Sequence, residues 1–183
     1  MSPQPWLVVI DMQVVFGEAD SPWFTPGYPT VEPVVESLVR EFGERVVYTR
    51  FVAPEHPQGA WVPYYEQWPF ALVPPDDRLY DLMPAFVGAP GHVVSRTTFG
   101  KWDDEMRGIL GEDATMILVG VSTDCCVIST ALAAADAGVR VRVVADACAG
   151  VSDADHERAL AAMALYAPLI EITTAEAVLG EVP

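Results

Sequence analysis

The stretch MILVGVSTDCCVIST, residues 116–130, reads as a strand followed by a turn and the start of a helix. Its first four residues, Met116–Val119, form an apolar run without alternation, which is typical of a strand with both faces buried. Thr123 and Asp124 are residue types that cap helices, and an alanine-rich helical pattern runs from Cys125 to Ala137. The stretch therefore predicts one strand–helix unit of a parallel sheet covered by helices.

The same alternation continues along the chain. Strands are predicted for further apolar, β-branched runs at Trp6–Ile10, Arg45–Tyr48, His92–Val94, Val139–Val144 and Leu169–Ile172. Helical spacing separates them at Val31–Phe42, Asp103–Leu110, Asp155–Tyr166 and Ala175–Leu179. Val139–Val144 alternates, so we expect it near an edge or partly exposed. These patterns predict an α/β fold, a three-layer doubly wound sheet of about six mainly parallel strands with helices on both faces, in one domain over residues 1–183.

Composition excludes several classes of function. The 183 residues carry a formal net charge of −16, which disfavours nucleic acid or an anionic membrane as partner and favours solubility. No apolar stretch is long enough to cross a membrane, and the N-terminal residues lack signal-peptide features, so we expect a cytoplasmic protein. The three cysteines, Cys125, Cys126 and Cys148, make a poor disulfide framework.

Two segments break the strand–helix rhythm. Phe51–Pro75 is rich in proline and aromatic residues without a sustained period, and Phe16–Pro29 is a shorter segment of the same kind. Connections of this type are usually functional loops, and aromatic side chains suit a flat or apolar ligand. We predict a pocket roofed by the aromatic residues Trp23, Trp61, Tyr64, Tyr65 and Trp68. Alternatively, these side chains pack the loops or a subunit interface.

The paired cysteines fall where a parallel sheet binds its ligands. Ligands bind beyond the carboxyl ends of the strands, and Asp11, Arg96 and the Cys125–Cys126 pair all follow predicted strand ends. A helix N-terminus and a nearby cation both favour a thiolate. A carboxylate, a cation and a thiol can therefore combine as base, electrostatic partner and nucleophile. The alternative is that the cysteines are small buried apolar residues.

Three motifs together resemble one family. Residues 120–127, G-V-S-T-D-C-C-V, are similar to the G-x-x-T-D-x-C-V signature of the isochorismatase-like cysteine hydrolases, which include nicotinamidases, N-carbamoylsarcosine amidases and ureidoacrylate hydrolases. V-V-I-D-M-Q, residues 8–13, resembles the family's first strand with its catalytic aspartate. V-V-A-D-A, residues 143–147, matches the strand after the cysteine helix. The resemblance spans nearly the whole chain in the expected order.

The resemblance assigns roles to individual residues. It implies that Cys126 is the nucleophile, because Cys126 stands two places after the aspartate and before a valine, while Cys125 fills a variable position and is expected to pack. Asp11 would be the catalytic base. Backbone N–H groups near Ser122 and Cys126 would hold the oxyanion, beside a cis peptide expected at Val121–Ser122.

The chain departs from the family at the cation. The family carries a lysine in a K-x-x-x-[SG]-x-F context, but residues 96–102 read R-T-T-F-G-K-W. Arg96 stands in the position of that lysine, and Lys101, the only lysine of the chain, lies five residues later. We predict Arg96 as the active-site cation because it stands at the strand end, with Lys101 as the alternative. An arginine holds charge but cannot shuttle a proton near neutral pH.

No metal or other cofactor is expected. Nicotinamidases have an Asp-x-His pair after the second strand, whereas the matching residues 49–52 here read T-R-F-V. His56, His92 and His156 are far apart in the sequence, and a zinc site needs clustered ligands.

The residues and the resemblance together predict a metal-independent cysteine hydrolase. It would cleave a small-molecule amide or related C–N bond through a Cys126 thioester. The alternatives are an isochorismatase-type vinyl-ether hydrolase and a catalytically silent small-molecule-binding member of the fold. Expected partners are a small-molecule substrate and further copies of the chain in a homo-oligomer.

Overall fold

The computed structural model of the protein describes residues 4–181. Six parallel strands form one sheet in the order β3-β2-β1-β4-β5-β6. The strands are β1 (Trp6–Ile10), β2 (Val46–Phe51), β3 (His92–Arg96), β4 (Thr115–Val121), β5 (Arg140–Ala149) and β6 (Ile170–Thr173). The α/β fold and the parallel sheet predicted from the apolar runs are thus confirmed. β5 lies second from the edge, and Arg140 at its start is exposed, as its alternating pattern indicated.

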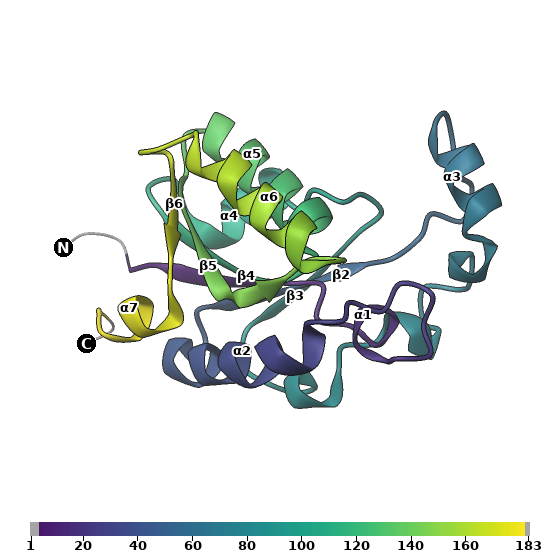
Figure 1. Cartoon of the computed structure of the whole chain (residues 1–183), viewed down its shortest axis with the longest axis horizontal. Coiled ribbons are helices and arrows are strands. Elements are labelled where there is room, and N and C mark those ends of the chain that lie inside the picture. The colour runs from purple at the N-terminus through teal and green to yellow at the C-terminus, as the bar shows by residue number, and fades with distance from the viewer. Residues whose placement is uncertain (1–3, 182–183) are drawn as a thin grey trace.

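Helices cover both faces of the sheet (Figure 1). On one face lie α2 (Tyr28–Phe42) and α7 (Ala175–Leu179), and on the other α4 (Asp104–Leu110), α5 (Ile128–Asp136) and α6 (Asp153–Ala164). The short helix α1 (Val14–Gly17) follows β1. Each face buries its own apolar layer between sheet and helices, which provides most of the driving force for a three-layer fold. No helix among residues 4–181 has the length and apolar character to cross a membrane.

The strand order reverses between β1 and β4, and this reversal positions the site. Ile10 pairs with Gly120 in parallel register, so the chain segments after both strands leave the same edge side by side. Gly120 has a φ of 108°, and a Cβ there would lie 2.2 Å from the carbonyl oxygen of Ile10. Only glycine permits this approach. In open α/β sheets, ligands bind at such a switch point.

The aromatic segment after β2 is partly helical. Within Phe51–Pro75, where the sequence showed no sustained period, α3 (Trp61–Gln67) forms and stands away from the sheet in Figure 1. Short 3₁₀ turns at Pro69–Ala71, Arg78–Tyr80 and Pro84–Phe86 carry the chain back to β3. A third apolar cluster, which includes Phe51, Tyr65 and Tyr80, holds the segment together. Aromatic contacts between neighbouring turns therefore hold this segment together, and it lacks the periodic apolar face by which a helix can be predicted.

Candidate active site

Asp11 stands directly after β1 and is completely buried. Its backbone has a φ of 48°, a left-handed conformation that aspartate tolerates better than most residues. The hydroxyl of Thr49 on β2 donates to Asp11 Oδ1 over 2.6 Å, and the Asp11 N–H donates to that hydroxyl oxygen over 3.1 Å. The neighbouring strand therefore fixes the orientation of the carboxylate.

Lys101 provides the cation beside Asp11. Its Nζ lies 2.9 Å from Asp11 Oδ2, and both side chains have no exposed surface. The ammonium also donates to the carbonyl oxygen of Thr98 over 2.7 Å and lies 5.1 Å from the centre of the Phe51 ring. A buried ion pair needs such additional partners to offset the cost of desolvation. The Lys101 N–H donates to Thr130 Oγ1 over 3.0 Å, which ties this segment to α5.

The prediction that Arg96 lies beside Asp11 is wrong. The Arg96 guanidinium turns toward the start of α4, where Nε lies 2.6 Å from Asp103 Oδ2 and Nη2 lies 2.9 Å from Glu105 Oε2. Asp103 also caps α4 by accepting from the N–H of Met106. Arg96 thus neutralises acidic residues at a helix start, and the cation that pairs with Asp11 is Lys101, five residues later.

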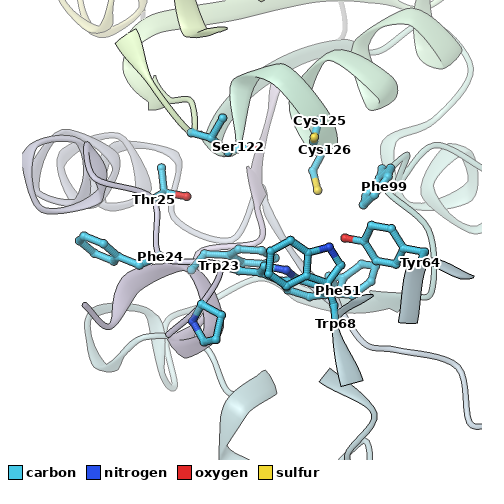
Figure 2. Close-up of a pocket in the computed structure, with 13 residues that line it drawn as sticks. Trp23, Phe24, Thr25, Phe51, Tyr64, Trp68, Phe99, Ser122, Cys125 and Cys126 are labelled. Carbon is cyan, nitrogen blue, oxygen red and sulfur yellow. The ribbon is translucent and has the colours of Figure 1, made fainter. Parts of the chain in front are cut away.

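Cys126 lies in one π-helical turn, Thr123–Val127, that joins β4 to α5. Figure 2 shows its Sγ pointing from this turn into the space above Trp23 and Trp68. Only 3% of the residue surface is exposed. Cys125 also lines the pocket, is less buried, and packs partly against the apolar layer under α5. The expected packing role of Cys125 therefore holds in part.

The surroundings of Cys126 favour the protonated form of its thiol. Burial raises the pKa of the Cys126 thiol well above its usual value, the Asp11 carboxylate raises this pKa further, and Lys101 lowers it. The sequence had favoured a thiolate, because a helix start and a cation both lower the pKa of a thiol. Desolvation outweighs both influences here. A base must therefore remove the proton during reaction, and Asp11 is placed to do so.

Side chains of the turn around Cys126 bond it to neighbouring segments. The peptide bond Val121–Ser122 is cis, as the resemblance implied. The capping roles predicted for Thr123 and Asp124 are wrong, because the turn has no side-chain cap. Thr123 Oγ1 instead lies 2.8 Å from His156 Nδ1 on α6, and Asp124 Oδ1 accepts from the Val151 N–H over 3.0 Å. Both residues thereby join the turn to the segment after β5.

A cavity of about 470 Å³ opens in front of Cys126. Trp23, Tyr64 and Trp68 line it, as predicted, but Trp61 and Tyr65 do not. Trp61 and Tyr65 stack on each other behind Tyr64, and Tyr65 is buried, so both shape the wall from behind. The lining consists of Phe16, Pro22, Trp23, Phe24, Thr25, Phe51, Tyr64, Trp68, Phe99, Ser122, Cys125, Cys126 and Val151.

Sequence reasoning missed two threonines that build the site. Thr49 orients Asp11, and Thr130 links α5 to Lys101. Isolated threonines in a strand and in a helix carry no signal of their own. For Lys101 a signal existed: it is the only lysine in a chain with 26 acidic residues, and acidic residues close to Arg96 in sequence could already satisfy that arginine.

Metal ligands do not cluster in the part of the chain that the structure describes. No group of three or more histidine, cysteine, aspartate or glutamate side chains among residues 4–181 is arranged to hold a metal ion. The acid–base groups of the candidate site are Asp11, Lys101 and Cys126, and all three influence one another electrostatically.

The family model of the isochorismatase domain matches residues 5–177, so the chain belongs to the isochorismatase family. This family of hydrolases fits the pairing of a buried carboxylate with a cysteine at the switch point of the sheet. A search of curated proteins finds no match.

Solved structures share the fold at low sequence identity. A cysteine hydrolase from Pseudomonas syringae pv. phaseolicola 1448A is 19% identical, with a TM-score of 0.84 over 98% of this chain and 92% of its own. N-carbamoylsarcosine amidase from Thermoplasma acidophilum is 21% identical, with a TM-score of 0.74 over 94% and 97%. The MAR1 ribonuclease from Caenorhabditis elegans is 19% identical, with a TM-score of 0.73 over 99% and 82%. Such likeness shows the fold alone.

Proposed function

We propose that the protein is a metal-independent cysteine hydrolase that cleaves a small-molecule amide or a related C–N bond through a thioester on Cys126. The observation that carries this proposal is the buried Asp11–Lys101 ion pair next to Cys126, whose thiol lines the cavity. A carboxylate that can accept a proton and a thiol that must lose one are the two partners that nucleophilic catalysis requires.

The first half of the reaction forms the thioester. Asp11 accepts the proton of the Cys126 thiol while Sγ forms a bond to the carbonyl carbon, and the C=O electron pair moves onto oxygen. Backbone N–H groups of Ser122 and Cys126 are the proposed donors to that oxyanion. The tetrahedral intermediate collapses by breaking the C–N bond, and the leaving amine takes the proton from Asp11.

The second half releases the acid. Water attacks the thioester carbon, and Asp11 accepts a proton from this water. The C–S bond then breaks, and Asp11 returns the proton to the Cys126 sulfur. The Lys101 ammonium, which lies 2.9 Å from Asp11 Oδ2, stabilises the negative charge of Asp11 between proton transfers. This assignment moves the electrostatic role from Arg96 to Lys101.

Two alternatives are less well supported. A vinyl-ether hydrolase needs no nucleophilic thiol, yet the Cys126 sulfur faces the cavity. The hypothesis of a catalytically silent binding protein was supported by Arg96, which stands in the position of the family's lysine. Because Lys101 pairs with Asp11, that departure no longer counts against catalysis.

The test is an assay of hydrolysis on a panel of small primary amides, in which the released ammonia is measured. Activity should vanish in Cys126→Ala and persist in Cys148→Ala, a matched cysteine variant outside the pocket-lining set. Intact-protein mass spectrometry after rapid acid quenching should detect an acyl adduct on Cys126. Turnover by Cys126→Ala at the wild-type rate would exclude a thioester mechanism.

A further inference from the structure

Aromatic side chains make up more than half of the residues that line the cavity. Seven of its lining residues are aromatic, namely Phe16, Trp23, Phe24, Phe51, Tyr64, Trp68 and Phe99. Its volume of about 470 Å³ lies in the range of small-molecule sites. A cavity with such walls gains most from a ligand that buries an apolar ring against them.

Trp23 fixes the shape of these walls. Its ring contacts Phe70 with centroids 4.9 Å apart, and it packs against Tyr64 at 6.0 Å and Trp68 at 6.1 Å. It also stacks on Phe16 and meets the edge of Phe51. In Figure 2, Trp23 lies below Cys126 across the cavity. Trp23 thus contacts side chains from loop 16–29, from strand β2 and from the α3 segment. Its ring presents a preformed aromatic surface to the substrate.

The described residues that line the cavity offer no charged side chain to a substrate. None of the described residues that line it carries a formal charge. Lys101, the nearest cation, is engaged by Asp11 and by the Thr98 carbonyl and has no exposed surface. Asp124 is not among the residues that line the cavity, and its Oδ2 lies 3.8 Å from the Cys125 sulfur. A substrate carboxylate would therefore lose its hydration without gaining a counter-ion.

The polar side chains that line the cavity are hydroxyls and thiols without a formal charge, namely those of Thr25, Tyr64, Ser122, Cys125 and Cys126. Figure 2 shows the hydroxyls of Thr25 and Tyr64 facing the space in front of Cys126. Burial and the two neighbouring cysteines raise the pKa of Tyr64 to about 12, so its hydroxyl stays neutral. Neutral hydroxyls suit an amide or a ring heteroatom and cannot neutralise an anion.

Building on the proposed function, we propose that the site takes uncharged carboxamides whose acyl group is an apolar ring, with Trp23 as the specificity-determining residue, and that it rejects substrates bearing a carboxylate. N-carbamoyl amino acids, which carry such a carboxylate, fall outside this class.

Binding to Cys126→Ala tests the proposal independently of catalysis. Calorimetry would compare 4-methylbenzamide with two ligands of similar size, 4-carbamoylbenzoate and 4-(aminomethyl)benzamide. The methyl compound should bind at least about 100-fold more tightly than the carboxylate, because the buried charge has no partner. Equal binding of methyl and carboxylate compounds would overturn the proposal. Tighter binding of the cationic compound would also overturn it and would identify an aromatic cage for ammonium groups.

A tryptophan pair tests the role of Trp23. Trp23→Leu should weaken binding of 4-methylbenzamide about 10-fold or more, because a large stacking surface is lost. Trp6→Leu is the matched control: Trp6 begins β1 at the opposite end of the strand, and it should leave binding unchanged. Equal effects of the two substitutions would contradict a specificity role.

The same compounds separate this proposal from the proposed function. If the wild type hydrolyses short aliphatic or carboxylate-bearing amides through Cys126 and ignores 4-methylbenzamide, the cysteine mechanism stands and the substrate class is wrong. If Cys126→Ala binds 4-methylbenzamide selectively while the wild type hydrolyses no amide, the substrate class stands and the hydrolase proposal is wrong.

Discussion

The choice of Lys101 over Arg96 as partner of Asp11 rests on burial. Both residues of the Asp11–Lys101 pair are fully buried, whereas Arg96 keeps 16% of its side chain exposed and pairs with surface carboxylates. A buried pair interacts in a low dielectric, and removing one partner leaves a charge without compensation. An exposed pair contributes little, because water screens it.

Lys101→Met should therefore abolish most activity. The expected loss in kcat/KM is about 10²- to 10³-fold, the scale seen when one electrostatic donor is removed from an active site. Arg96→Met should change kcat/KM less than about threefold and lower stability by at most about 1 kcal/mol. Steady-state kinetics of the two variants are the measurement, and a larger loss in Arg96→Met would restore the original assignment.

The double variant Asp11→Asn with Lys101→Met separates stability from catalysis. Lys101→Met alone should cost about 3 to 5 kcal/mol in the free energy of unfolding, because it leaves a buried carboxylate unpaired. Neutralising both residues should recover much of that loss without recovering activity. Urea unfolding of the four proteins in the cycle measures the coupling, and an additive result would contradict a direct ion pair.

Alkylation of Cys126 should depend on pH in opposite ways in the two single variants. Asp11 raises and Lys101 lowers the pKa of the Cys126 thiol. Iodoacetamide reacts with the thiolate, so the rate profile should move to lower pH in Asp11→Asn and to higher pH in Lys101→Met. Peptide mapping identifies the labelled cysteine, and Cys148→Ala controls for the other buried thiol. A shift to higher pH in Asp11→Asn would refute the assigned contact.

Sequence patterns could locate Asp11 and Cys126 but not the cation. Asp11 follows β1 directly and Cys126 lies in the turn that joins β4 to α5, so the rule for parallel sheets brings them to one edge. Lys101 follows its strand end by a loop whose path depends on a long-range hydrogen bond from its own N–H to Thr130. A local pattern cannot encode that bond, and the strand-end rule favoured Arg96 instead.

On the scale of elements, Thr130 connects α5 to the loop that delivers Lys101. Its hydroxyl donates to the Cys126 carbonyl oxygen over 2.7 Å and accepts from the Lys101 N–H over 3.0 Å. One buried side chain thus links the backbones of the nucleophile and the cation. Any movement of α5 against this loop would disturb both residues together.

Thr130→Val should weaken both stability and turnover. The substitution keeps the shape of the side chain but leaves a buried N–H without its acceptor, at a cost of about 1 to 3 kcal/mol in the free energy of unfolding. Turnover should fall more than KM rises, because Lys101 would lose its support. Thr130→Ser keeps the hydroxyl and is the control. Equal behaviour of the two variants would show that the hydroxyl has no positioning role.

Regular elements were predicted better than irregular ones. Trp6–Ile10 and Ala175–Leu179 were predicted with the bounds that the structure has. β5 was predicted to end at Val144 but runs to Ala149, past a register irregularity against β4. The helix predicted from Cys125 takes in the last three residues of the π-helical turn at Thr123–Val127, because a pattern with a period of 3.6 residues does not reveal such a turn.

At the scale of the whole molecule, buried phenols and thiols should limit alkaline stability. Burial raises the pKa of Tyr48 from 10.0 to about 12 and that of Cys148 from 9.0 to about 12, and it also raises the pKa of Tyr28. The unfolded chain releases these protons first as pH rises. Their contribution to stability is therefore complete below pH 9 and declines between about pH 9 and 12.

The free energy of unfolding should fall steadily above pH 9, by up to about 1.4 kcal/mol per pH unit for each group that titrates only in the unfolded chain. Urea unfolding at a series of pH values measures the slope. Cys148→Ala removes one such group, so its slope between pH 9 and 11 should be shallower than that of the wild type. Constant stability up to pH 11 would contradict the raised pKa values.

The burial of Lys101 has a consequence for chemical modification of the protein. Lys101 carries the only ε-amino group in the sequence, and the fold leaves none of it exposed. Acylating reagents and lysine-modifying enzymes therefore meet no accessible lysine while the fold is intact. Each Lys101 adduct then records an opening of the active-site region, so the rate of acylation at low reagent concentration reports how often that region opens. A ligand held in the cavity should slow the labelling in proportion to its occupancy.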